Sequence, residues 1–321
     1  MKNWLNRMMG SASNAEAPAK PDTAAAAEHE DTGAEVDATY YRWLVAKAGY
    51  EAPPETETRI IDAVGAVTQD PAAASELVPR VPEVLVQLLG SLNNEASSGE
   101  LARQMTQDTV LVAEVIREAN SAYYRSFTPV KTVEAAIMML GQNGLRMLLT
   151  RLALRPLIRL QDSGFARQAA PHVWSHAQRS ALAASLMAPG LSAPVYEAYL
   201  SGLMQNVGQM VALRVIDRIQ GDGRIPGSSE FGARLQDASR HLSAAIAGYW
   251  HFPDAVCEAI ARAGDPDEVR LAQALAQGDQ IAKLRLLIDA NVIDEDDDLV
   301  TEGLDSFHRR CLDKLVNGAD E

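Results

Sequence analysis

Apolar residues recur along most of the chain at intervals of three and four, the spacing that places side chains on one face of an α-helix. The run Val110, Leu111, Val115 and Ala119 is one example, and the leucine-rich stretch 143–160 is another. The apolar and polar alternation that is typical of half-buried strands does not extend over a useful length of this sequence. The pattern therefore predicts an all-α protein.

The stretch 119–141, ANSAYYRSFTPVKTVEAAIMMLG, combines a helix end, a rigid turn and a new helix start. The side chain of Asn120 competes with the backbone for hydrogen bonds, so we expect the preceding helix to end there. Pro129 fixes its own φ angle and holds the turn extended. Thr132 is placed to cap the next helix, and Gly141 is placed to end it.

Changes in composition along the chain predict four parts. Residues 11–36 are rich in alanine, proline and acidic groups, with almost nothing to bury, and residues 1–10 are a short basic and apolar terminal piece; we expect residues 1–36 to be disordered. Residues 37–78 predict a short helical extension, interrupted by prolines, that packs on the main domain. The main helical domain spans 79–290, and an acidic linker with a final amphipathic helix spans 291–321.

Composition sets limits on where the protein works. Hydrophobic residues make up 47% of the 321 positions, which is ample for a core. The two cysteines, Cys257 and Cys311, lie far apart in apolar helical contexts, which favours buried free thiols over a disulfide or a metal site. No apolar run approaches the roughly 18–20 residues of a membrane span, and the apolar core of a secretory signal is missing. We therefore expect a cytoplasmic protein.

The formal charge of −14 is concentrated at the two ends of the chain, and the body between them is nearly neutral. Such a body does not attract a phosphate backbone over a broad surface. Nucleic-acid binding is therefore disfavoured.

The stretch 119–141 also resembles the HDOD family, the HD-related output domain of bacterial signalling proteins. The resemblance combines residue types and spacing, and it extends from about Val81 to about Leu287. It implies a multi-helix, HD-like domain that is non-catalytic and takes part in signal transduction. The helical extension at 37–78 would lie outside that domain.

The HD superfamily, to which HDOD domains are similar, is built around a histidine on one helix, a His-Asp pair on another, and a late aspartate. In that superfamily these groups hold divalent metals that activate water for phosphoester or nucleotide hydrolysis. By this resemblance, His176 matches the first histidine and Asp279 the last aspartate. Gln205 and Asn206 stand where the His-Asp pair would be, and Gln209 stands where such enzymes often have lysine.

These substitutions decide the expected chemistry. Carboxamides are neutral and poor ligands for divalent cations, so Gln205 and Asn206 leave only His176 and Asp279, whereas catalytic metals generally take three or more protein ligands. We expect no bound metal, no cofactor and no catalytic residue. Gln205 and Asn206 are expected to form a buried hydrogen-bonded network, with His176 and Asp279 as structural groups. Metal ligation by His176 and Asp279 is the alternative.

Arg151, Arg155 and Arg159 recur every four residues and predict a cationic stripe on one helix. One interpretation is a solvated face whose long stems cover apolar surface. The other is a site for an anion or an acidic partner.

The sequence and the resemblance together favour a non-enzymatic signalling or scaffold protein. It would bind a protein partner, or a small anionic signal, through a degenerate HD-type domain. The alternative is a metal-dependent phosphohydrolase with an atypical site made by His176 and Asp279. The oligomeric state and the identity of the partner stay open.

Overall fold

The structure is a computed structural model. It describes residues 23–77, 96–121, 128–159, 163–265 and 269–315, and in addition positions 83, 87, 88, 90, 91, 94 and 124. For residues 23–31, 75, 76 and 157–159 it describes the backbone alone.

Helices account for nearly all of the regular structure, which confirms the all-α class. In chain order they are α1 (Thr23–Val45), α2 (Pro54–Thr68), α3 (Pro71–Glu76), α5 (Ser98–Met105), α6 (Thr109–Ala119), α7 (Val133–Arg159), α8 (Gly164–Met187), α9 (Val195–Met204), α10 (Val207–Gln220), α11 (Ser229–Tyr249), α12 (Asp254–Arg262), α13 (Arg270–Asp289), α14 (Asp298–Thr301) and α15 (Ser306–Lys314). Two short strands, β1 (Gly49–Tyr50) and β2 (Ile225–Pro226), pair in parallel.

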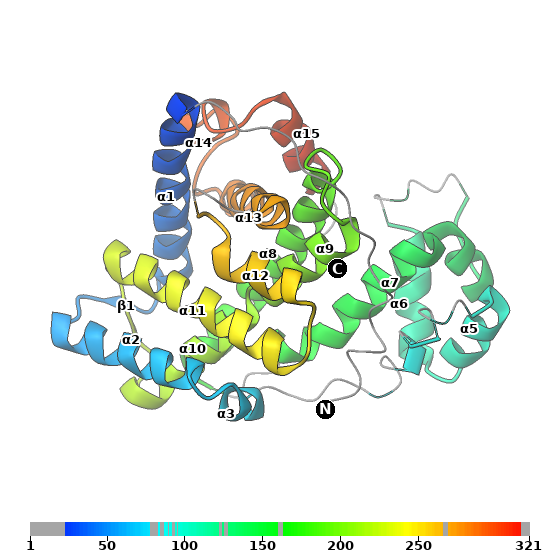
Figure 1. Ribbon diagram of the computed structural model, residues 1–321, viewed down its shortest axis with the longest axis horizontal. Coiled ribbons are helices and arrows are strands. Elements are labelled where there is room, and N and C mark those ends of the chain that lie inside the picture. The colour runs from blue at the N-terminus through cyan, green and yellow to red at the C-terminus, as the bar shows by residue number, and fades with distance from the viewer. Residues whose placement is uncertain are drawn as a thin grey trace.

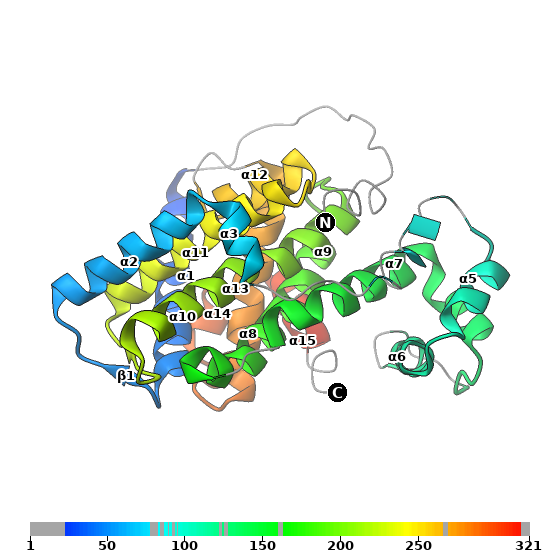
Figure 2. The same cartoon turned by 90° about the horizontal axis from the view of Figure 1, so that it is seen from below.

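The helices form a larger body and a smaller group at one end of it (Figures 1 and 2). The smaller group consists of α5, α6 and the first part of α7. Helix α7 runs on from there into the body, where it contacts α8 and α9. In the body, α8 packs along both α9 and α13.

Small residues let the central helices of the body approach closely. A Cβ atom at Gly278 of α13 would lie 2.5 Å from the backbone nitrogen of Ala184 on α8. One at Gly202 of α9 would lie 2.5 Å from Cα of Ala181, also on α8. Because backbone cannot rotate out of the way, these contacts require glycine. Because α8 and α13 pack closely, His176 on α8 and Asp279 on α13 lie on neighbouring helices.

The turn between α6 and α7 is built as its sequence predicts. Helix α6 ends at Ala119, and Asn120 holds the turn by donating to the Val130 carbonyl (2.8 Å) and accepting from the Val130 N–H (2.7 Å). The Thr132 hydroxyl caps α7 by accepting from the Ala135 N–H at 3.2 Å. Gly141, with φ of 63° and ψ of 179°, breaks the helical path.

Replacing Asn120 with alanine is expected to lower the free energy of unfolding by about 1–3 kcal/mol, because both polar groups of Val130 lose their partner. Chemical denaturation of the wild-type and variant proteins measures this difference. Asn120→Asp keeps an acceptor for the Val130 N–H and should fall between them. An Asn120→Ala protein within about 0.5 kcal/mol of wild type would contradict this role.

The N-terminal boundary predicted from composition is wrong in part. Helix α1 begins at Thr23, inside the segment 1–36 that was expected to be disordered. Its second half packs on α11 and α13, and Val36 is fully buried there. The helix is therefore stabilised by tertiary packing, which an average over composition does not detect. Residues 1–22 lie outside the described residues, so the prediction for them is untested.

The C-terminal helix expected within 291–321 is present as α15, and Cys311 and Leu312 pack into the core. None of the described helices has the combination of length and hydropathy that crossing a bilayer requires.

Candidate functional site

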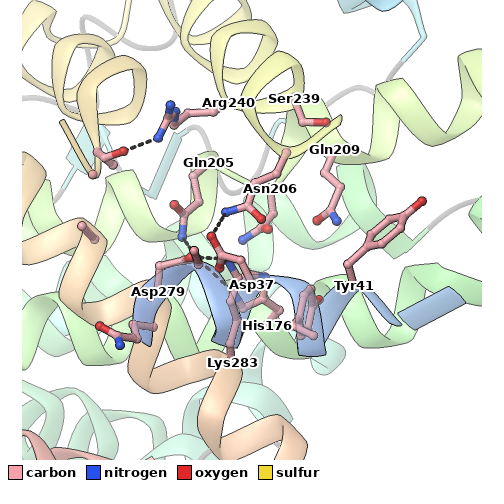
Figure 3. Close-up of a pocket in the computed structure, with 18 of the residues that line it drawn as sticks. Asp37, Tyr41, His176, Gln205, Asn206, Gln209, Ser239, Arg240, Asp279 and Lys283 are labelled. Carbon is pink, nitrogen blue, oxygen red and sulfur yellow. Dashed lines mark hydrogen bonds and ion pairs between the residues drawn. The ribbon is translucent and has the colours of Figure 1, made fainter. Parts of the chain in front are cut away.

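Five residues singled out in the sequence line one cavity of about 530 Å³ in the body (Figure 3). His176 comes from the middle of α8 and Asp279 from the middle of α13. Gln205 and Asn206 form the junction between α9 and α10, and Gln209 lies in the first turn of α10. Residues more than a hundred positions apart are thus brought together in one place.

A serine on α11 fixes the junction between α9 and α10. The Ser243 hydroxyl donates to the Gln205 carbonyl at 2.6 Å and accepts from the Gly208 N–H at 2.8 Å. A Cβ at Gly208 would lie 2.2 Å from the Ser239 carbonyl oxygen, so glycine lets α10 meet α11 here. These contacts hold the two carboxamides of Gln205 and Asn206 at the cavity wall.

Asp279 is the centre of a polar network. One of its carboxylate oxygens, Oδ1, lies 2.9 Å from His176 Nε2 and accepts from Gln205 Nε2 at 2.9 Å. The other oxygen, Oδ2, lies 2.6 Å from the Lys283 ammonium. Gln205 also donates to the hydroxyl of Ser180. Both oxygens of Asp279 are therefore engaged by side chains of the protein.

Lys283 joins α13 to the N-terminal helix. Its ammonium nitrogen lies 2.5 Å from Oδ1 of Asp37 on α1, and Oδ2 of Asp37 accepts from Gln236 Nε2 at 2.8 Å. The Lys283 side chain is only 3% exposed. This lysine is thus a buried cation between Asp37 and Asp279, and Figure 3 shows the three side chains converging.

The charges of this cluster stabilise one another. Burial alone would raise the pKa of Asp279, but the Lys283 ammonium and His176 outweigh it and hold that pKa well below its usual range. Burial alone would lower the pKa of Lys283, but Asp279 and Asp37 outweigh it and raise that pKa. Lys283 is therefore charged and Asp279 ionised at neutral pH.

Tyr40 of α1 closes one side of the cluster. Its ring lies 4.9 Å from the His176 ring, centroid to centroid, and the Lys283 ammonium lies 5.7 Å from the Tyr40 ring centroid. Burial raises the pKa of the Tyr40 hydroxyl, so this group stays protonated and can donate a hydrogen bond.

Sequence reasoning missed Asp37, Tyr40 and Lys283. Lys283 had a local signal, because Asp279 and Lys283 are four residues apart on one helix face, where opposite charges pair. Asp37 and Tyr40 had no such local signal, since they belong to a helix at the edge of the segment expected to be disordered.

The two described side chains of the arginine stripe, Arg151 and Arg155, form ion pairs within the protein. Arg151 pairs with Glu118 of α6, and Arg155 lies 3.4 Å from Glu114 of the same helix. These pairs fasten α6 to α7. Arg159 lies outside the described side chains, and the use of the stripe as an anion or partner surface stays a prediction.

The divalent metal implied by the HD resemblance does not fit the residues at this site. Asp279 already contacts an ammonium, an imidazole and a carboxamide, and Lys283 places a positive charge where a cation would have to approach. Among the described residues, no group of three or more His, Cys, Asp or Glu side chains is arranged to hold a metal. Gln205 and Asn206 do not replace the absent ligands.

Fold and site define a multi-helix, HD-like domain. Residues 78–266, more than half of the chain, match the family model described as the HDOD domain. The chain therefore belongs to the HDOD family, as its sequence pattern predicts.

Two solved structures share the fold. One is a "Putative metal-dependent phosphohydrolase" from Shewanella amazonensis SB2B, with 18% identity, 81% of this chain and 99% of that chain covered, and a TM-score of 0.58. The other is an HDOD domain protein with unknown function from Geobacter sulfurreducens, with 22% identity, 78% and 94% coverage, and a TM-score of 0.51. At these identities the similarity concerns the fold alone.

An uncharacterized protein of Treponema pallidum (strain Nichols) is 22% identical over 193 residues. The matched region covers 57% of this chain and 37% of the length of that relative.

Proposed function

We propose that this HDOD protein is a non-catalytic signalling or scaffold protein, which acts by binding through a degenerate HD-type site. The observation that carries the proposal is the Lys283 ammonium, 2.6 Å from Asp279 and 2.5 Å from Asp37. A buried lysine supplies a positive charge to both carboxylates from within the protein. We therefore expect that no divalent cation binds at this site to activate water.

The family supports the signalling part of this proposal and the site supports the non-catalytic part. The partner would be a protein of a signalling pathway, and we propose that the protein works in the cytoplasm. A nucleic-acid partner is disfavoured, because the chain carries a formal charge of −14.

Assays of purified protein against nucleotides and phosphodiesters, with manganese, iron or zinc added, test the proposal. We expect no hydrolysis above the protein-free control and less than stoichiometric metal by elemental analysis. The competing function, a phosphohydrolase that uses His176 and Asp279, predicts bound metal and turnover. Hydrolysis by the wild-type protein that is lost in His176→Ala would contradict the proposal.

A further inference from the structure

The cavity at the site has the size of a small-molecule binding site. Its volume of about 530 Å³ lies within the range of about 300–1,000 Å³ that is usual for ligand pockets. Five helices contribute to its wall: α1, α8, α10, α11 and α13, together with the turn at 263–265. Figure 3 shows Ser239 and Arg240 on α11, across from the cluster of Asp279 and Lys283.

The charges that line the cavity do not favour an anion. Three carboxylates, Asp37, Asp265 and Asp279, outnumber two cations, Arg240 and Lys283. Lys283 is held by two of those carboxylates. Arg240 pairs at 2.7 Å with Asp237 and donates to the carbonyl of Ala263. A phosphate group would therefore meet a net negative lining whose cations are already paired.

Carboxamides dominate the uncharged part of the lining. They are Gln205, Asn206, Gln209, Gln236, Gln273, Gln277 and Gln280. A carboxamide offers a donor and an acceptor in one plane, and it can pair with the adjacent groups on the edge of a nucleobase, as asparagine and glutamine do with adenine. Tyr40 and Tyr41 also line this cavity.

Several donors of this lining are buried without a partner among the described residues. They are the hydroxyls of Tyr40 and Ser239 and the amide nitrogens of Asn206 and Gln280. The ring nitrogens of His176 and Nε of Arg240, which also belong to lining residues, are likewise buried without a geometrically formed hydrogen bond. Tyr40, Ser239 and Asn206 are each at least 96% buried. A buried donor without a partner is unfavourable, so several of them around one cavity indicate a ligand that accepts hydrogen bonds.

We propose that this cavity binds an uncharged nucleoside or a molecule of the same chemistry: a planar heterocycle with carbonyl and ring-nitrogen acceptors. The acceptors take hydrogen bonds from Asn206, Gln280 and Ser239, while the ring lies against the tyrosines. The inference rests on the proposed function, because it takes Lys283 rather than a metal to neutralise Asp279.

Calorimetric titration of the full chain tests the ligand class. The probes are adenosine, guanosine, cytidine and uridine, each beside its 5′-monophosphate, with a chelator present. We expect at least one nucleoside to bind with a Kd below about 1 mM and its monophosphate to bind at least about tenfold more weakly. If no nucleoside binds, water alone fills the cavity and the inference is overturned. A monophosphate that binds as tightly as its nucleoside also overturns it.

Two serine variants separate binding from folding. Ser239→Ala removes an unpaired donor of the cavity, so affinity for the bound nucleoside should fall about three- to tenfold while Tm stays equal or rises. Ser201 is the matched control, because its hydroxyl is also buried without a partner among the described residues but does not line the cavity. Ser201→Ala should leave affinity unchanged. Equal affinity in Ser239→Ala and wild type would count against this site.

The two proposals can fail separately. Hydrolysis with added manganese overturns the non-catalytic function whatever the titration shows. If no nucleoside binds in the presence of the chelator and no hydrolysis is seen, the nucleoside site is contradicted and the non-catalytic function still holds.

Discussion

Replacing Lys283 with methionine is expected to lower the free energy of unfolding by about 3–5 kcal/mol, the cost of removing one partner from a buried ion pair. The substitution keeps the length of the side chain and its apolar stem. It leaves Asp279 and Asp37 without the ammonium that lies 2.6 and 2.5 Å from them. Urea denaturation at pH 8 measures the difference.

The pH dependence of the stability of this variant should differ from that of the wild type. In the wild type, burial opposes and Lys283 and His176 favour the ionised form, so the pKa of Asp279 is depressed. A depressed pKa gives stability that is complete above the unfolded-state value of about 3.9 and is lost as the pH falls through the folded-state pKa. In Lys283→Met, only His176 remains to oppose burial, so we expect the pKa of Asp279 to rise from its depressed wild-type position. The folded variant then takes up a proton at a higher pH than the folded wild type does, and the deficit in stability should shrink as the pH falls.

Arg262→Met is the matched control. Arg262 pairs at 3.2 Å with Glu258 and at 3.6 Å with Asp265, and its side chain is 37% exposed. Exposed pairs contribute about 0–1 kcal/mol, so this variant should stay near wild type at both pH values. If Lys283→Met costs no more than Arg262→Met, Lys283 does not hold the site together.

Replacing Gly278 with alanine is expected to destabilise the protein by about 3 kcal/mol, at the upper end of the usual cost of overpacking. Its Cβ would lie 2.5 Å from the backbone nitrogen and 2.7 Å from Cα of Ala184. The helices α8 and α13 must then separate, which pulls Asp279 from His176. Thermal and chemical denaturation measure the loss.

Gly65→Ala controls for helix propensity. Gly65 lies inside α2 with nothing within 4 Å of the position of a Cβ. Alanine is favoured over glycine in a helix by about 0.5–1 kcal/mol, so this variant should be stabilised. The same substitution thus has opposite signs at the two positions. A neutral or stabilised Gly278→Ala protein would contradict the close α8–α13 packing.

The fold and part of the site could be predicted because their signals are local. Asn120, Thr132 and Gly141 each act on backbone within ten residues, and the structure has the helix end, cap and break at those positions. The HD resemblance located His176 and Asp279, which the fold then brings to within 2.9 Å of one another.

The pairing of Lys283 with Asp37 could not be predicted in the same way. Asp37 bonds to it across 246 positions of sequence, and neither residue carries a motif. Asp37 lies next to a segment whose composition is typical of disorder, and only packing of α1 on α11 and α13 orders it. The ion pair that neutralises the site is therefore a property of the tertiary structure.

The central claim is that Lys283, and not a metal, supplies the positive charge at Asp279. A crystal structure of the protein grown in excess manganese, with anomalous scattering recorded, tests it most directly. We expect no anomalous peak at the site, and the Lys283 ammonium within hydrogen-bond distance of Asp279. A manganese ion bound by His176 and Asp279, with Lys283 displaced, would contradict the account.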